Sequence, residues 1–397
     1  MNKIISVITL ALVIAAPEGF AQEFRIEPVL RAGYESDDNA TLNVLTIEEA
    51  DISGVLLEAS ARFSYNSPTT IFYATPRVLV RNYGEEEFDT TDEFFAIRFD
   101  RRWESSRFQI RGRYAKELAR TAERVDTDFE IEDPDEIPDD SSGLVSIQDD
   151  RQRIEVRPSY TYEISDASSM EFAVQHSDVT YEQQLALLLN DYTNTRANLN
   201  FRRSWSPRNR VLFGATYRTY EAEGNDAVSG YGISGGFEHR MSEKTMLRIV
   251  VGAENTELTG GDSEIDPVGE ITLTRQLETI RLLAQYRRVV SGGGSGNLEN
   301  RDIININFTR DLTEKITAGL GVRAYSTKSR RNDGGTFDER DYIQLRAQLV
   351  WNLTETFQFE ANYRYTVLDR AFLGESGNSN NIALWLNWRP TGYSNTR

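Results

Sequence analysis

Arginine is the residue type in this sequence with the clearest chemical implication. Arg111 and Arg113, like Arg153 and Arg157, are separated by an even number of residues. Even spacing places both side chains of a pair on one face of a β-strand. A guanidinium group is a planar fork that binds carboxylate, phosphate or sulfate oxygens through two parallel hydrogen bonds. The arginines therefore indicate anion binding, provided that strands gather them on one surface.

The same alternation assigns further arginines to this face, where acidic residues such as Glu58, Asp100 and Glu155 are fewer. A low-dielectric wall with an excess of positive charge concentrates anions. The alternative is structural, because arginine–glutamate ladders can stiffen a wall without selecting a solute. The residues that we expect to line the path of an anionic solute are Arg62, Arg77, Arg98, Arg111, Arg113, Arg153, Arg157, Arg196, Arg218, Arg248, Arg281, Arg323, Arg346 and Arg364.

Catalytic groups are scarce in this sequence. It contains two histidines, His176 and His239, and no cysteine. Both histidines fall on the opposite face of their strands from the arginines, and neither has a serine and an acid aimed at a common site. Histidine and cysteine clusters with metal-ligand spacing are also missing. We expect no enzyme, no cofactor and no metal, and a carboxylate pair for sugar cleavage is the enzymatic alternative.

The elements that must position the arginines are short strands. Near the C-terminus, Phe357, Phe359 and Ala361 alternate with Gln358 and Glu360. A period of two is typical of a strand with one apolar face. The pattern recurs along the chain and predicts about 18 strands (16–18). Their predicted cores are 24–34, 54–65, 71–83, 93–103, 107–118, 152–164, 169–181, 192–205, 209–220, 229–240, 245–256, 266–275, 279–290, 301–310, 315–326, 341–351, 356–367 and 381–389.

The connections between these strands alternate between short turns and long loops. Short turns such as 66–68 and 206–208 contain Asn, Ser and Pro, which favour tight turns. Four of the five tryptophans lie beside the short turns, as in the interfacial girdle of a membrane barrel. The sequence therefore predicts an all-β fold, a transmembrane antiparallel up-and-down β-barrel. Short turns of such barrels face the periplasm, so we expect the N- and C-termini there.

The N-terminal residues predict a secretory signal peptide. Lys3 precedes the apolar run 4–16, and Gly19, Phe20 and Ala21 form a small-x-small cleavage site. We expect a signal peptide at 1–21 and one outer-membrane β-barrel at 22–397. The formal net charge of -18 argues against nucleic acid as a partner. Outer-membrane lipid and lipopolysaccharide are the expected partners of the outer surface, and the oligomeric state stays open.

The longest predicted loop, 119–151, is the candidate constriction of the lumen. It contains an acidic run that includes Asp126, Asp128, Glu130 and Glu132. Such a run could bind divalent cations or cover a basic pore, although its spacing does not match an EF-hand. The alternative is a solvated surface loop.

Residues 32–39, Ala-Gly-Tyr-Glu-Ser-Asp-Asp-Asn, join an aromatic strand end to a loop rich in Asp and Asn. This segment resembles the outer-membrane β-barrel (porin-like) proteins of bacterial exopolysaccharide loci. The resemblance implies association with a secreted polysaccharide and its export machinery. The strand number and the arginine-rich lumen are also similar to those of alginate-export barrels, which pass an acidic polymer. The chain departs from many outer-membrane barrels because Arg389, Pro390 and a polar tail follow the last predicted strand.

These observations predict a channel in the Gram-negative outer membrane for export or translocation of an anionic exopolysaccharide or oligosaccharide. Lumen arginines would supply weak contacts at many sites, which let a polymer move on. Two alternatives stay open. One is a general or substrate-specific diffusion porin, and the other is a non-conducting surface or adhesion barrel.

Overall fold

The computed structural model describes residues 23–42, 51–84, 88–119, 149–182, 189–225, 227–257, 263–294, 296, 298–329, 340–370 and 375–396. Within these ranges the chain forms one antiparallel sheet. Its strands are β1 (Glu23–Asp37), β2 (Ile52–Asn66), β3 (Thr70–Asn82), β4 (Thr90–Arg102), β5 (Ser106–Leu118), β6 (Asp150–Ser165), β7 (Ser168–Tyr181), β8 (Tyr192–Ser206), β9 (Asn209–Ala222), β10 (Val228–Ser242), β11 (Thr245–Glu257), β12 (Ser263–Gln276), β13 (Ile280–Gly292), β14 (Leu298–Asp311), β15 (Ile316–Ser329), β16 (Arg340–Asn352), β17 (Phe357–Arg370), β18 (Glu375–Trp388) and β19 (Tyr393–Thr396).

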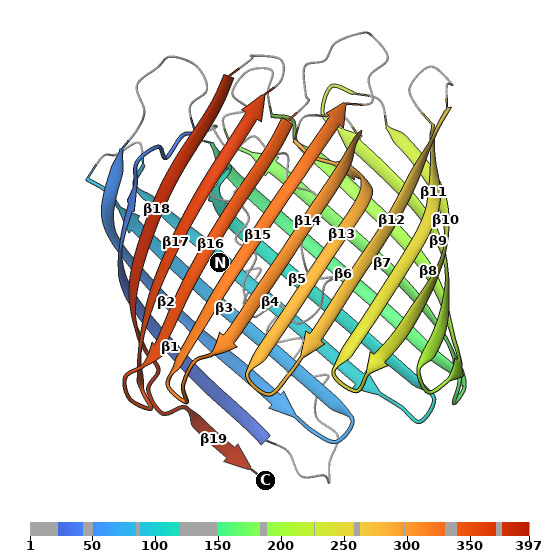
Figure 1. Cartoon of the computed structure of the whole chain (residues 1–397), viewed down its shortest axis with the longest axis horizontal. Coiled ribbons are helices and arrows are strands. Elements are labelled where there is room, and N and C mark those ends of the chain that lie inside the picture. The colour runs from blue at the N-terminus through green and yellow to red at the C-terminus, as the bar shows by residue number, and fades with distance from the viewer. Residues whose placement is uncertain are drawn as a thin grey trace.

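The sheet closes on itself as an eighteen-stranded barrel of tilted strands (Figure 1). Each strand from β1 to β18 pairs with its neighbours in sequence, and β18 pairs with β1 from Leu30–Trp388 to Asp37–Asn381. Closure leaves no free sheet edge where this ladder is continuous. The predicted all-β up-and-down barrel of about 18 strands is therefore confirmed.

Several strands extend a few residues beyond their predicted cores, and the largest differences from the prediction lie near the C-terminus. β18 begins at Glu375, although the sequence pattern placed its start at 381, because 375–380 lacks apolar alternation and is held by backbone pairing to β17. The short β19 was not predicted. It pairs with Glu23–Ile26 of β1, the part of β1 that extends beyond the end of β18.

Short connections gather at one end of the barrel, where β19 also lies, and long connections gather at the other (Figure 1). Side chains stabilise several of the short turns. The hydroxyl of Ser67 accepts a hydrogen bond from the amide of Thr70 (3.0 Å), and that of Thr354 accepts one from the amide of Phe357 (2.9 Å). Ser and Thr favour turns through such local bonds. The predicted alternation of short and long connections holds from β1 to β17. The predicted long loop 368–380 is wrong, because β17 and β18 pair through most of it and leave a connection of 371–374.

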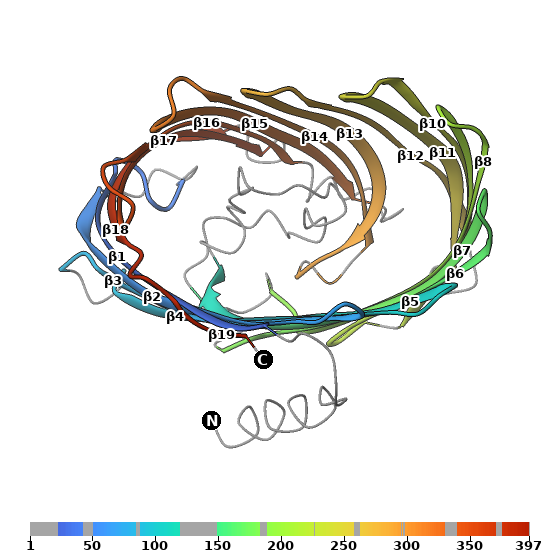
Figure 2. The same ribbon diagram turned by 90° about the horizontal axis from the view of Figure 1, so that it is seen from below.

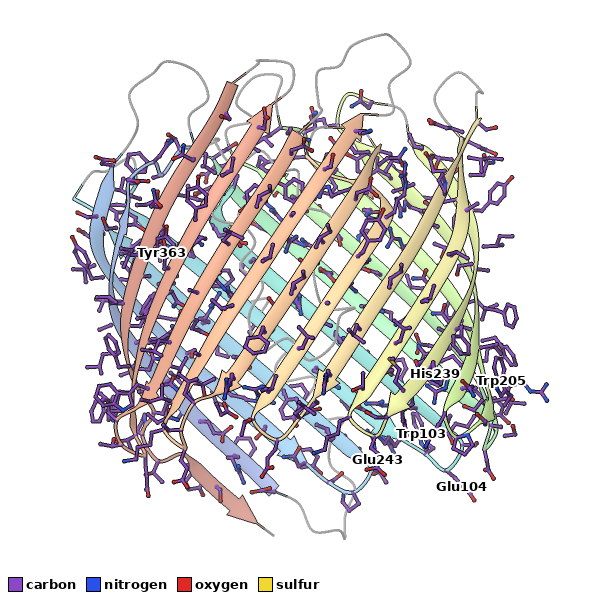
Figure 3. All side chains as sticks on the ribbon, viewed as in Figure 1. Trp103, Glu104, Trp205, His239, Glu243 and Tyr363 are labelled. Atoms are coloured by element: carbon purple, nitrogen blue, oxygen red, sulfur yellow. The ribbon has the colours of Figure 1, made fainter. Side chains whose placement is uncertain are left out.

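The outward face of the barrel is apolar. Ile233 and Ile265 are among its most exposed side chains, at 72% and 71%. Trp103, Trp205, Trp351 and Trp388 are also exposed, and Figure 3 shows Trp103 and Trp205 near the short-turn end. Within the described ranges, no helix has the length and apolar character needed to cross a bilayer. An apolar band on a closed sheet, with an aromatic girdle at its rim, is typical of a barrel that spans a membrane.

The pairing between β12 and β13 stops before these strands reach the long-loop end of the barrel. Pairing of β12 with β13 stops at Gly269–Arg288, although β12 begins at Ser263 and β13 ends at Gly292. Figure 2 shows the end of β13 curving into the barrel. Val290, which strand alternation places on the outward face, is 0% exposed. The barrel is therefore folded inward at this point.

Two apolar clusters hold the inward fold. On one side of it, Val290 and Leu298 pack with Tyr192, Tyr220 and other residues of the opposite wall. The Tyr220 hydroxyl donates a 2.6 Å hydrogen bond to the carbonyl oxygen of Gly293. A second cluster, on the other side, consists of Leu42, Ile303, Tyr325, Tyr342 and Leu368. Contacts between strands far apart in sequence thus narrow the long-loop half of the lumen.

Two predictions concern residues that the structure does not describe. The signal peptide at 1–21 lies outside the described residues, as does 120–148, which contains the acidic run of the proposed constricting loop. The narrowing that the described residues do show comes from β13 and β14.

Candidate functional site

The strand register places every arginine of the predicted solute path on the inward face. Five of them form one series across adjacent strands, which we call the arginine row. Arg98 of β4 is paired with Arg111 of β5, which is paired with Arg157 of β6. Arg196 of β8 is paired with Arg218 of β9. Contact of these residues with a solute stays a prediction.

Two polar residues continue the arginine row on neighbouring strands. Tyr73 of β3 is paired with Arg98 and forms the end of the row nearest the short turns. Gln175 of β7 lies between the two groups of arginines. It is paired with Arg196 on β8. On its other side, the pair Val156–His176 places Gln175 opposite Arg157 on β6. Neighbouring strands are about 4.8 Å apart, so the row from β4 to β9 spans about 24 Å.

The arginine row climbs the wall because the strands are tilted. Arg98 lies near the short-turn end of β4, four residues before Arg102. Arg218 lies near the long-loop end of β9, four residues before Ala222. The row therefore runs from one mouth of the barrel toward the other, in the direction that a translocating solute would take.

The like charges of the arginine row are unfavourable for the fold. Residues directly opposite each other in an antiparallel pair have Cβ atoms about 4.5–5.5 Å apart, and like charges there are destabilising. Arg98, Arg111 and Arg157 place three guanidinium groups in this relation. Binding of an anion between these guanidinium groups stays a prediction.

Other predicted arginines are paired with carboxylates of the wall. Ion pairs join Arg77 to Glu58 (3.7 Å), Arg153 to Glu155 (2.6 Å), Arg248 to Glu270 (3.8 Å) and Arg364 to Glu35 (3.6 Å). Within the arginine row, Arg218 is 3.4 Å from Glu254. The alternative of arginine–glutamate ladders thus describes this part of the set.

The remaining predicted arginines have varied surroundings. Arg62 stacks on the ring of Tyr73, with its guanidinium carbon 4.1 Å from the ring centroid. Arg113 is paired with Glu155, and Arg346 lies opposite Arg364. Arg281 lies at the short-turn end of β13, whereas Arg323 is buried at the middle of β15. These residues do not form one site with the arginine row.

The prediction missed a buried group of charges on the long-loop half of the lumen. The carboxylate of Glu299 is 2.9 Å from Arg340 and 3.3 Å from Arg301, and all three side chains are buried. Arg340 and Glu299 lie on strand ends that the predicted cores 341–351 and 301–310 left out. Extending the alternation by a few residues at each strand start would have found both.

The fifth tryptophan points inward and contacts an arginine. The guanidinium carbon of Arg31 lies 4.4 Å from the centroid of the Trp385 ring. Arg31 also forms ion pairs with Glu360 (3.0 Å) and Glu58 (3.5 Å). Cation–π contact and ion pairing together fix this guanidinium at the closure of the barrel.

Both histidines lie on the outward face, in accordance with the sequence. The Nδ1 atom of His176 is 2.8 Å from the hydroxyl of Thr195. His239, labelled in Figure 3, stacks on Phe237, and its Nδ1 atom is 2.8 Å from the side-chain oxygen of Asn209. Among the residues described, no cluster of His, Asp or Glu has the geometry of a metal site.

Comparisons with known proteins give structural likeness alone. No protein-family model and no curated protein matches the chain. OccAB4 of Acinetobacter baumannii is 9% identical, with 94% of this chain and 98% of that chain covered and a TM-score of 0.49. OpdQ of Pseudomonas aeruginosa is 9% identical, with 94% and 98% covered and a TM-score of 0.47. The outer-membrane channel DcaP of A. baumannii is 9% identical, with 93% and 97% covered and a TM-score of 0.46. Values of this size give no basis for assigning a family or a function.

Proposed function

We propose that this protein is an outer-membrane channel for anionic solutes. The observation that carries the proposal is the arginine row, a series of inward guanidinium groups on β4–β6 and β8–β9 of a closed barrel, with Gln175 between the two groups. Closely spaced positive charge in a confined lumen attracts anions and excludes cations. The apolar belt supports a location in the Gram-negative outer membrane, with the short turns and both termini in the periplasm.

Within this class, the substrate that we propose is an acidic oligosaccharide or exopolysaccharide that is exported. A chain with regularly spaced carboxylates could bind several members of the arginine row at once. Arg98, Arg111 and Arg157 are partly exposed. Each contact with such an arginine is weak, so the chain could exchange one arginine for the next as it advances. Charge-assisted bonds to guanidinium groups provide the required orientation of each carboxylate.

Planar-bilayer recordings with the purified barrel test the channel proposal. In a salt gradient, the reversal potential should show that anions are more permeant than cations. Acidic oligosaccharides added to one side should block the current reversibly, and neutral oligosaccharides of the same length should block it less. Absence of conductance would instead favour the non-conducting adhesion barrel, and a cation preference would contradict the proposed role of the arginines.

The inward fold of β13 favours a second candidate, a diffusion porin for small anions. Arg196 and Arg218 donate hydrogen bonds to the Val290 carbonyl oxygen (3.4 and 2.6 Å), which fixes this strand end across the lumen. A narrowed lumen suits small solutes better than a polymer. Liposomes that contain the protein distinguish the two: release of long acidic oligosaccharides supports export, whereas a sharp size limit near a disaccharide supports the porin.

A further inference from the structure

A cavity lies between the infolded end of β13 and the wall formed by β8–β12. Its volume is ≈ 190 Å³. Arg196 and Arg218, which line it, are on the inward face of the wall, whereas Gly269 and Arg288, which also line it, are at outward positions of β12 and β13. Because β13 is folded inward here, outward positions of this strand face the inner side of the β8–β12 wall, and the cavity lies between them at the edge of the sheet.

The sheet has a gap at this cavity. The β12–β13 ladder ends at Gly269–Arg288, and β13 then leaves the wall. Among the described strands, none pairs with the side of β12 that β13 vacates between Ser263 and Val268. The cavity therefore lies behind an edge of β12 that no described strand covers.

The gap lies at the height of the apolar belt. Ile265 on the unpaired part of β12 and Ile233 two strands away are both highly exposed on the outward face. Val251, between them on β11, is exposed as well. Lipid chains are the natural neighbours of such side chains. The unpaired edge of β12 therefore lies at the height of apolar side chains that face lipid.

Polar side chains interrupt the apolar belt at the edge of the gap. The hydroxyl of Tyr286 donates a 2.7 Å hydrogen bond to Asp302, and the guanidinium of Arg288 is 3.7 Å from the same carboxylate. All three residues occupy outward positions on β13 and β14. Polar groups on a lipid-facing surface are costly, and these three offset that cost by bonding to one another at the edge of the gap.

The cavity itself combines positive charge with apolar walls. Arginines at four positions line it (196, 218, 287 and 288), against two glutamates (254 and 270). Val250, Val268, Val289 and Val290 supply the apolar part of the lining. This combination fits an anionic group that is attached to a hydrocarbon chain.

We propose that the gap between β12 and β13 is a lateral binding site for an anionic amphiphile. The phosphate or carboxylate head of the ligand lies in the cavity beside Arg287 and Arg288, and its acyl chain leaves through the gap into the membrane. The cavity shares Arg196 and Arg218 with the arginine row, but Arg287 and Arg288 lie outside that row. The inference goes beyond the channel proposal, because it concerns a different ligand and does not require conductance.

Calorimetric titration of the full barrel in nonionic detergent tests the site. Dodecyl phosphate should bind at least about tenfold more tightly than inorganic phosphate or dodecyltrimethylammonium, since both the head and the chain contribute. Equal binding of inorganic phosphate would overturn the lateral part of the proposal. Equal binding of the cationic amphiphile would overturn the role of the arginines.

Variants then locate the site. The double change Arg287→Gln and Arg288→Gln should weaken dodecyl phosphate binding about tenfold or more, because charged hydrogen bonds to the head are lost. The matched control is Arg202→Gln with Arg210→Gln, which removes the same charge from ion pairs elsewhere on the lumen wall and should change binding less than about twofold. Similar losses in both variants would contradict the proposal.

A variant that keeps every charge tests the site independently, in case the double variant does not fold. Val268→Trp fills the apolar side of the cavity and should weaken dodecyl phosphate binding while leaving the circular-dichroism spectrum of the barrel unchanged. Retention of full binding by this variant would contradict the site.

In phosphatidylcholine nanodiscs, competition by added phosphatidylglycerol would identify a resident membrane lipid as the ligand, and lack of competition would identify a single-chain amphiphile. Photoactivatable dodecyl phosphate should label β12 and β13, and uniform labelling of all strands would refute the location.

Discussion

The arginine row makes a quantitative prediction about anion block. Arg111 and Arg157 are directly opposite each other on β5 and β6. A singly charged anion about 5 Å from both guanidinium groups gains about 0.8 kcal/mol from each in a water-filled lumen. At 0.1 M salt the Debye length is about 10 Å, so about 0.5 kcal/mol from each group survives screening. The two arginines together are then worth about 1 kcal/mol, or about fivefold in anion affinity.

The perturbation is the double change Arg111→Gln and Arg157→Gln, and the assay is block of chloride current by glucuronate in planar bilayers. At 0.1 M salt the half-blocking concentration of glucuronate should rise about fivefold. At 1 M salt the Debye length falls to about 3 Å. The two arginines together then contribute about 0.3 kcal/mol to anion affinity. The half-blocking concentration should therefore rise less than about twofold in the double variant.

A matched control separates the arginine row from lumen charge in general. Arg202 and Arg210 also lie on the inward face, but each is paired with a glutamate, at 3.2 and 3.1 Å. Changing both to Gln removes the same charge and should alter the half-blocking concentration less than about twofold. The reasoning is refuted if both double variants weaken block equally, or if the effect of Arg111 and Arg157 is the same at both salt concentrations.

Three further predictions concern the stability of the barrel, measured by urea unfolding from liposomes unless stated. Leu57→Arg places a charge in the lipid-facing belt and should lower the free energy of unfolding by about 2–4 kcal/mol. The inward change Ser60→Arg should lower it by less than half of that amount. Equal losses would contradict the assigned faces. Glu299→Gln should cost about 3–5 kcal/mol, because two buried arginines lose their carboxylate; a neutral effect would argue against that buried network. Tyr220→Phe removes the hydrogen bond to Gly293, worth about 1 kcal/mol, and should speed amide exchange at the end of β13, while unchanged exchange would show that this bond does not hold the inward fold.

Strand number and facing could be predicted from the sequence because alternation is a local property. A side chain such as Leu57 and its neighbour Glu58 must point to opposite faces of a strand, wherever the strand lies. The belt of apolar side chains, the tryptophans beside the short turns and the inward placement of the arginines follow from this period and from turn-forming residues. Strand ends such as 375–380 did not follow, because pairing with β17 extends β18 through residues that have no strand pattern of their own.

The inward fold of β13 could not be read from its sequence. The segment that contains Val289 and Val290 has the alternation of an ordinary wall strand, and alternation places Val290 against lipid. Its burial instead depends on Arg218 and Tyr220, which lie more than seventy residues earlier in the chain and bond to the backbone of this segment. Such contacts exist only once the barrel has closed.

An arginine-rich inner face, and the sign of the charge that it would attract, follow from the amino-acid order alone, since the period of two is set by backbone geometry. Which arginines lie together depends on how the strands pair in the closed barrel. Register and strand tilt assemble Arg98, Arg111 and Arg157 into one row, whereas Arg77 pairs with a carboxylate of the neighbouring strand and Arg153 with one of its own strand. The same pairing geometry opened the gap beside β12, because a sheet that curls inward must release its neighbour.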